Sequence, residues 1–297
     1  MEYLKAFRLL IVLLLIVILM TSAFKKGFCQ STLKVSRDRA DASLVIQDST
    51  VRSTKAFFPA GQSNADGRVL ESEWPLKLRD SLENFKGYFH ETQRFYSAKA
   101  GFNVSDQGYW LRGDSLKNGL EIPLHKYLKF FGKWKFAKIT RGGAPVTLFN
   151  FDNNTIFTRE GFGIQMDAFH ALSAEIDSTK SFWFWLQGET EAAESTLDTN
   201  YGSDLQNVIG DVGVHIYQDL YGIMLLTNDA LDAITYPNTA GIRQQQLSVA
   251  QNNYMGIYDP SGLDLKDSVH YSAEAYEKIA KEIAIIYYKR FYNITLR

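Results

Sequence analysis

The chain has 297 residues, of which 45% are hydrophobic and 22% charged, a composition typical of a globular protein with a substantial core. Its 32 Lys and Arg residues balance 33 Asp and Glu residues, which argues against a nucleic-acid-binding protein and against a protein held on a membrane by a basic surface. The single cysteine, Cys29, excludes an intrachain disulfide and a zinc cluster built from cysteines.

The N-terminus has the pattern of a secretory signal peptide. Lys5 and Arg8 precede an uninterrupted apolar run over residues 9–20, and small residues typical of a cleavage site follow at 21–23. The run is shorter than the roughly 20 residues that a transmembrane helix needs. We therefore predict that residues 1–23 are a signal peptide and that the protein is secreted or periplasmic. An uncleaved membrane anchor stays open if residues 21–24 extend the helix.

The remainder is expected to comprise an irregular N-terminal arm, residues 24–54, and one domain, residues 55–297. Short runs rich in aromatic and branched residues predict buried strands at 56–60, 135–140, 181–187, 221–227 and 254–258. Amphipathic stretches predict helices at 120–131, 165–176, 203–220, 241–252 and 273–291. Ser272 is the expected N-cap of the last helix.

Strands that alternate with helices predict an α/β fold, in which a mainly parallel sheet of about five strands is covered by helices on both faces. Residues 66–118 are rich in aromatic and polar side chains without a clear period, and we expect them to form long surface loops.

A serine, Ser63, follows the first predicted strand. Gly61 permits a tight turn there, and the carboxyl end of a parallel strand is where open α/β sheets bind their ligands. The segment is not the G-x-S-x-G elbow of α/β-hydrolases, because Ala65 stands where the second glycine belongs. A serine in such a turn can equally be a helix N-cap, so this segment alone does not identify a nucleophile.

Two further segments place polar side chains near strand ends. Gln187 ends the strand at 181–187, where its amide could donate to a developing oxyanion or could only tie down a loop, with Glu189 capping the next helix. Asp267 precedes His270 by three residues, so its carboxylate can orient the imidazole that a serine nucleophile needs as a base. A lone D-x-x-H pattern arises easily by chance, and its weight comes from its position beside a strand end.

In this order, the three segments resemble the SGNH (GDSL-type) hydrolase superfamily, and within it the sialate O-acetylesterase or carbohydrate esterase family 6 branch. The family's G-Q-S-N, W-x-Q-G-E and D-x-x-H blocks stand here as Gly61–Asn64, Trp185–Glu189 and Asp267–His270. Weaker similarities lie at 140–144 and 243–246. The resemblance covers roughly residue 55 to the C-terminus and implies a flavodoxin-like three-layer α/β/α sandwich.

The resemblance also implies a catalytic triad. Ser63 would be the nucleophile, His270 the general base and then acid, and Asp267 the group that orients the imidazole. The implied oxyanion hole consists of the backbone N–H groups of Ser63 and Gly143 together with the side chain of Gln187.

Supporting roles fall to other residues of the same blocks. We expect Glu189 and Asn64 to hold neighbouring groups in place, and Arg243 to be either a substrate contact or part of a structural ion pair. The chain departs from the family at Glu191, where an Asp is common, and at Ala144, where a Thr often follows the double glycine. Ala144 is expected to change the wall of the pocket and hence the preference for the acyl group or the alcohol of the ester.

The predicted function is that of an exported serine esterase that removes O-acetyl groups from carbohydrates. Two alternatives stay open: a carbohydrate-binding protein of the same fold without turnover, and an esterase or lipase for longer acyl chains. An acetylated carbohydrate is the expected partner, with no nucleic acid and no membrane beyond the N-terminal segment. Trp110 is the best candidate for stacking on a sugar ring.

We expect no metal and no cofactor, because ester hydrolysis by a serine needs neither. The remaining histidines show no metal-ligand spacing; they are His90, His125, His170 and His215.

Overall fold

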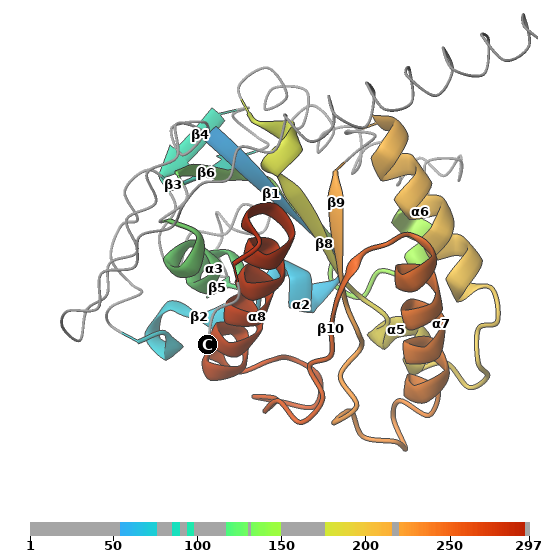
Figure 1. Cartoon of the computed structure of the whole chain (residues 1–297). Helices are drawn as coiled ribbons and strands as arrows, with labels where there is room; N and C mark the ends of the chain where they lie inside the picture. Colours follow the sequence, from blue (N-terminus) through green and yellow to red (C-terminus); the bar gives the residue numbers. More distant parts are fainter. Residues whose placement is uncertain are drawn as a thin grey trace, which may run out of the picture. The chain divides into compact units, whose positions relative to one another are not determined.

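The computed structural model (Figure 1) describes residues 54–75, 85–89, 94–97, 117–129, 132–149, 176–215 and 220–294. All of them belong to one compact unit of the chain, Thr50–Arg297. The predicted signal peptide, nearly all of the N-terminal arm, Trp110 and residues 165–175 of one expected helix lie outside the described residues. Within the described ranges, no helix is both long enough and apolar enough to cross a membrane.

An eight-stranded sheet forms the centre of this unit. Its strands are β1 (Thr54–Gly61), β3 (Phe85–Phe89), β4 (Arg94–Ser97), β6 (Lys133–Phe136), β7 (Ile139–Thr140), β8 (Phe182–Leu186), β9 (Tyr221–Leu225) and β10 (Gly256–Tyr258). The order across the sheet is β10-β9-β8-β1-β6-β3-β4, and β7 pairs with the end of β1 beyond β6. Every pair is parallel except β3 with β4 at one edge.

All five predicted strands form, and they are the contiguous parallel core β10-β9-β8-β1-β6. The run predicted at 135–140 divides into β6, which begins at Lys133, and the short β7. The expectation of loops over residues 66–118 is wrong in part. That stretch supplies β3 and β4, and also β2 (Val69–Leu70) and β5 (Lys117–Asn118), which form a separate two-stranded sheet. These strands are short and mix polar with apolar residues, as strands at or near an edge commonly do, so they have no clear sequence period.

Helices cover both faces of the sheet, which gives the predicted three-layer sandwich (Figure 1). The long helices are α3 (Glu121–Leu128), α6 (Tyr201–His215), α7 (Thr239–Asn252) and α8 (Ala273–Tyr292). α3 packs against α8, and α6 packs against α7. The shorter ones are α2 (Ser63–Asp66), α5 (Glu189–Ala192) and the 3₁₀ turns η2 (Glu71–Glu73), η6 (Val146–Phe149) and η7 (Ser178–Lys180).

Alternate residues of β1 face the two helical layers. Phe58 belongs to a buried cluster with Val208 of α6 and Ile242 of α7. Phe57 points the other way and stacks on Phe182, whose ring lies 5.2 Å from that of Tyr287 in α8. All residues of β8 and all of β1 except the half-buried Thr54 are therefore buried, which explains why these strands are mostly continuous apolar runs rather than alternating ones.

The C-terminal helix begins where the sequence predicts. The hydroxyl of Ser272 accepts a hydrogen bond from the backbone N–H of Ala275 at 3.1 Å, which is the expected N-cap. The helix preceding β9 begins two residues before its predicted start, because α6 spans Tyr201–His215. Residues 216–219 of the predicted helix lie outside the described residues, and Leu220, its predicted end, is not helical.

Glycines at the ends of β1 and β8 allow the loops at that edge to come close together. Gly61 has a φ of +135°, and a Cβ on it would lie 2.0 Å from the carbonyl oxygen of Leu186. Gly188 has the same φ, and a Cβ there would lie 2.3 Å from the hydroxyl of Thr227. Only glycine fits such positions. The loops that follow β1, β8 and β9 consequently meet at the carboxyl edge of the sheet.

Candidate active site

The nucleophile predicted by the sequence stands at the start of a short helix. β1 ends at Gly61, Gln62 follows, and Ser63 is the first residue of α2. The N–H of Gly67 closes the turn on the carbonyl oxygen of Ser63 at 2.9 Å. Because a first helical residue has no intrahelical acceptor, the backbone N–H of Ser63 is left for another partner.

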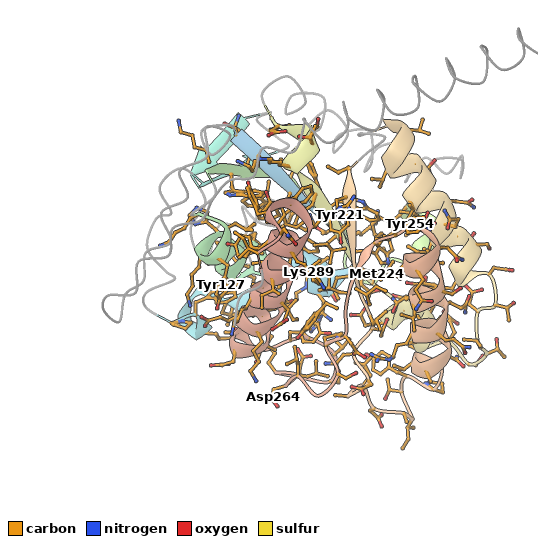
Figure 2. The ribbon with its side chains drawn as sticks, in the orientation of Figure 1. Tyr127, Tyr221, Met224, Tyr254, Asp264 and Lys289 are labelled. Atoms are coloured by element: carbon orange, nitrogen blue, oxygen red, sulfur yellow. The ribbon has the colours of Figure 1, made fainter. Side chains whose placement is uncertain are left out.

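The predicted base lies at the tip of a small hairpin between β10 and α8. Leu265 pairs with Tyr271 in an antiparallel bridge, and the N–H of Lys266 donates to the carbonyl oxygen of His270 at 2.8 Å. Asp264, labelled in Figure 2, lies just before this hairpin, and its carbonyl oxygen accepts from the N–H of Ser272 at 3.3 Å. These backbone bonds fix the turn that carries Asp267 and His270.

The structure brings Ser63, His270 and Asp267 into one line. Nε2 of His270 lies 3.0 Å from the Oγ of Ser63, although 207 residues separate the two. On the other side of the ring, Nδ1 lies 2.8 Å from the Oδ2 of Asp267. This is the hydrogen-bonded relay in which a serine can be deprotonated by an imidazole that a carboxylate orients.

Asp267 is held by its own turn. Its Oδ1 accepts from the backbone N–H groups of His270 at 2.7 Å and Val269 at 2.9 Å. Partial burial raises the pKa of Asp267, but these hydrogen bonds and the imidazole outweigh it, so the pKa lies below the ordinary value. As a carboxylate, Asp267 accepts the Nδ1 proton of His270, which leaves the lone pair of Nε2 facing Ser63.

Gly143 lies beside the nucleophile. It belongs to the turn at 141–144, in which a Cβ placed on Gly142 would be 3.7 Å from the Cβ of Ser63. Gly143 itself has a φ of +68° and open space where its Cβ would be. Across the described ranges, neither its N–H nor that of Ser63 has a hydrogen-bond partner. Two of the three predicted oxyanion donors therefore stand free next to the nucleophile.

Gln187, the third predicted donor, is not free. It is fully buried, and its Nε2 donates to the carbonyl oxygen of Ala144 at 3.2 Å and to the Oε2 of Glu191 at 2.5 Å. Its Oε1 accepts from the hydroxyl of Tyr201 at 3.0 Å. Contrary to the prediction, the structure places this side chain in the interior, where it ties the end of β8 to its neighbours and leaves no N–H for a substrate.

Asn64 joins the turn of Ser63 to the turn of His270. Its Nδ2 donates to the Oε1 of Glu189 at 2.7 Å and to the carbonyl oxygen of Val269 at 3.0 Å. Its Oδ1 accepts from the N–H of Tyr271 at 3.2 Å. The side chain is 1% exposed, so these bonds are shielded from water and constrain both turns.

Glu189 is a buried carboxyl group with one unpaired oxygen. Burial raises its pKa, the hydrogen bond from Asn64 lowers it, and the nearby carboxylate of Glu191 raises it again, with the net effect a rise. Its Oε2 has no hydrogen-bond partner within the described part of the chain. Burial also raises the pKa of Glu191 against its hydrogen bonds. The first turn of α5 thus holds two carboxyl groups whose pKa values are raised by burial.

A cleft of about 640 Å³ opens over Ser63 and His270. Gln62, Arg68, Thr190 and Tyr236 contribute to its lining, and the sequence singled out none of them. Of these residues, only Gln62 could have been identified from the sequence, because it belongs to the G-Q-S-N block. Arg68 and Tyr236 lie in loops and Thr190 lies in α5, and no pattern in the sequence marks any of the three as lining a cleft.

Arg243 lies away from this cleft and has the structural role that was one of its two predicted alternatives. Its guanidinium donates to the carboxylate of Asp259 at 2.7 Å and to the carbonyl oxygen of Thr227 at 2.5 Å. His125 is a buried histidine of α3, and burial, with a smaller contribution from Lys129, lowers its pKa to about 4. Among the described residues, no group of three or more His, Cys, Asp and Glu side chains is placed to hold a metal ion.

No protein-family model matches the sequence, and no curated protein matches it either. Solved structures match in fold. A protein from Arabidopsis thaliana superposes with a TM-score of 0.64 at 15% identity, over 81% of this chain and 99% of that one. NanS gives 0.58 at 12% identity, over 82% of this chain and 98% of its own. The chain shares their fold.

A third structure, XAC1771, a carbohydrate acetylesterase from Xanthomonas citri, gives a TM-score of 0.57 at 12% identity, over 82% of this chain and 57% of that one. The shared architecture is the three-layer α/β/α sandwich that the resemblance implies. At these identities the likeness extends to the fold alone.

Proposed function

We propose that this protein is an exported serine esterase that hydrolyses O-acetyl esters on carbohydrates. The observation that carries the proposal is the relay from Asp267 through His270 to Ser63, with distances of 2.8 and 3.0 Å, at the edge of an open cleft. Residues that only stabilise the fold would have no need for a hydroxyl, an imidazole and a carboxylate aligned in this way.

The chemistry follows from the geometry. His270 takes the proton of Ser63 as its Oγ attacks the acyl carbonyl carbon, and the backbone N–H groups of Ser63 and Gly143 stabilise the negative oxygen that forms. When the carbon–alkoxy bond breaks, the imidazolium gives its proton to the leaving sugar oxygen. Water then attacks the acetyl-serine with His270 again as base, which releases acetate and restores Ser63.

The cleft favours a carbohydrate over a long acyl chain. Most of the residues that line it are polar, among them Gln62, Arg68 and Glu194, and they include one half-buried aromatic residue, Tyr236. Sugars are bound by such mixtures of hydrogen-bonding groups and aromatic faces, whereas a long acyl chain needs a continuous apolar slot. The likeness in fold to a carbohydrate acetylesterase supports the same choice.

The direct test is acetate release from acetylated xylan, sialic acid, pectin and peptidoglycan. We expect release from at least one of them, and abolition by Ser63→Ala and by His270→Ala. A profile from acetyl to octanoyl esters separates this activity from that of a long-chain esterase, which would prefer octanoyl. Glycan binding without release of any acyl group would instead favour the carbohydrate-binding alternative.

Export is tested separately. The pattern of residues 1–23 supports a signal peptide, so we expect the protein outside the cytoplasm with a new N-terminus near residue 24. N-terminal sequencing of the secreted or periplasmic protein measures this. A membrane-bound protein that retains Met1 would indicate the uncleaved anchor.

A further inference from the structure

We infer that Tyr236 and Glu194 form the subsite for the alcohol part of the ester, and that the negative charge around them selects a neutral sugar over an acidic one. The inference rests on the proposed esterase function and narrows the substrate class of the same site. Both residues line the cleft over Ser63 and His270. Among the described residues that line it, Tyr236 is the only Phe, Tyr or Trp.

The loop that carries Tyr236 is held in place by backbone hydrogen bonds. The N–H of Tyr236 donates to the carbonyl oxygen of Asp232 at 2.8 Å. Two residues further on, the backbone N–H of Asn238 donates to the carbonyl oxygen of Ala192 at 3.1 Å, and its Nδ2 donates to that of Glu194 at 2.6 Å. Tyr236 is thus tied to the segment that carries Glu194 before any ligand binds, which lowers the entropic cost of binding.

The side chains of Tyr236 and Glu194 end in polar groups that are free to bind. Within the described ranges, neither the phenol of Tyr236 nor the carboxylate of Glu194 has a hydrogen-bond or ion-pair partner. Tyr236 also packs against the buried cluster that includes Ile242 of α7, so its body is anchored while it lines the cleft. A sugar suits both groups, because its C–H face packs on an aromatic ring and its hydroxyls donate to a carboxylate.

Tyr236 lies on the side of the cleft that the leaving alcohol must occupy. As the ester bond breaks, His270 gives its proton to the alcohol oxygen, so the alcohol has to lie beside the imidazole. Burial raises the pKa of the Tyr236 phenol, and the negative charges of Glu189 and Asp267 raise it further. Because Asp267 is bonded to the imidazole of His270, the phenol lies within electrostatic reach of the base.

The charges near this subsite are negative. Asp232 is an exposed carboxylate of the same loop, and Glu194 is exposed as well. Arg68 is the one Lys or Arg among the described residues that line the cleft, and its guanidinium is already paired with Asp66 at 2.5 Å. A sugar that carries its own carboxylate would be repelled here, whereas a neutral sugar would not.

A matched pair of substrates tests the selection by charge. Mono-O-acetylated methyl glucuronide, as the free acid and as its uronate methyl ester, differs in the charge of one group. We expect kcat/KM for acetate release to favour the neutral form roughly fivefold at low salt, and the preference to shrink in about 0.5 M NaCl, which screens exposed charges. Glu194→Gln should reduce the preference about threefold. Glu282→Gln, at a half-buried position of α8, is the control and should leave it unchanged.

Variants of Tyr236 test the aromatic contact. Tyr236→Leu removes the ring, and Tyr236→Phe removes only the hydroxyl. The comparison substrate is ethyl acetate, whose alcohol has no ring to stack. The ratio of kcat/KM for the neutral sugar ester to that for ethyl acetate should fall about tenfold in Tyr236→Leu and about threefold in Tyr236→Phe. Tyr254→Leu, at a tyrosine that is 89% exposed, is the matched control and should retain the ratio.

Each outcome decides the inference. Equal rates on the free acid and its methyl ester, or a preference for the acid, would overturn the selection by charge. An unchanged ratio in Tyr236→Leu would overturn the subsite. Should Tyr236→Leu not fold, as judged by its melting temperature, Tyr236→Phe and Glu194→Gln decide. If the unmodified protein hydrolyses neither ethyl acetate nor any sugar ester, the proposed function has failed; hydrolysis of ethyl acetate without discrimination between the two sugar esters would defeat this inference alone.

Discussion

The Nδ2 of Asn64 donates to the carbonyl oxygen of Val269 at 3.0 Å, and this bond connects the turn of the nucleophile to the turn of the base across 205 residues of sequence. Because Asn64 follows Ser63 and Val269 precedes His270, the spacing between the two reacting side chains depends on it. The second Nδ2 proton extends the connection to the buried carboxyl group of Glu189 at 2.7 Å.

Replacing Asn64 with alanine should therefore affect both stability and turnover. The change removes the partner of the N–H of Tyr271, of the carbonyl oxygen of half-buried Val269 and of the Oε1 of Glu189. A buried group left without a partner costs about 1–3 kcal/mol. We expect a melting temperature several degrees lower and a fall in kcat of at least tenfold. Asn252→Ala, at an exposed position of α7, is the control. Equal melting temperatures for Asn64→Ala and Asn252→Ala would contradict the role of Asn64.

Asp267→Asn should inactivate the protein while leaving the turn intact. The amide oxygen can still accept from the N–H groups of Val269 and His270, but the amide nitrogen would donate to Nδ1 of His270. This fixes the tautomer that carries its proton on Nε2, which cannot accept from Ser63, and the expected loss of kcat is on the order of 10⁴. A variant that keeps a tenth or more of the activity would show that Asp267 does not orient His270.

The lowered pKa of Asp267 also predicts a pH dependence of stability. A carboxyl group with a lowered native pKa stabilises the folded state above its ordinary pKa of 3.8, and that contribution is lost as the pH falls through the native pKa. Thermal unfolding of the unmodified protein and of Asp267→Asn should thus differ at pH 6 and converge in acid. If the difference in melting temperature between the two proteins stays constant down to acid pH, the stability does not depend on the ionisation of Asp267.

Glu189 predicts the opposite trend. Its pKa is raised above the ordinary 4.5, so the unfolded state loses this proton first, and the group destabilises the fold increasingly as the pH rises from about 4.5 to the native value. Glu189→Gln removes the ionisation and keeps an oxygen for the amide of Asn64. Its melting temperature should match that of the unmodified protein in acid and exceed it at neutral pH. Glu194→Gln, at an exposed neighbouring position, should show no such pH-dependent gain in melting temperature. If Glu189→Gln shows no gain either, the raised pKa of Glu189 is disproved.

Gly61→Ala should disrupt the sheet edge that carries the nucleophile. A Cβ 2.0 Å from the carbonyl oxygen of Leu186 cannot be accommodated, and the φ of +135° adds strain of about 1–3 kcal/mol. Gly210→Ala is the matched control, because Gly210 lies inside α6 with open space around its Cβ, where alanine should stabilise by about 0.5–1 kcal/mol. Chemical denaturation of both variants measures the contrast. A Gly61→Ala protein as stable as the parent would mean that the end of β1 lies farther from β8.

Much of this architecture could be predicted because the strands of a parallel sheet are buried on both faces. The aromatic run of β8 and the apolar run of β1 each have an unambiguous pattern, and the C-terminal helix has both a period and a cap at Ser272. The edge strand β4 and its neighbour β3 were not predicted, because Lys86 and Gly87 interrupt the apolar residues of β3, and β4 has only two aromatic residues between Arg94 and Ser97. Side chains at such an edge need not be uniformly apolar.

The sequence predicts the site correctly only where the position of a residue in the chain also determines where its side chain points. Asp267 and His270 lie in one tight turn, so their contact follows almost from spacing alone. Gln187 and Gln62 are both polar residues at strand ends, and nothing in the sequence says which amide turns inward. That choice is made by Tyr201, Glu191 and Thr190, which come from other segments and pair with one amide or the other only in the folded chain.

The most direct test of the central claim is the rate of acetate release by the purified protein and by its Ser63→Ala variant, on p-nitrophenyl acetate and on the glycan panel at neutral pH. We predict release by the unmodified protein, and a loss in Ser63→Ala on the order of 10³-fold or more with an unchanged melting temperature. Acetate release that persists in Ser63→Ala would contradict the account, because among the described residues the hydroxyl hydrogen-bonded to Nε2 of His270 is that of Ser63.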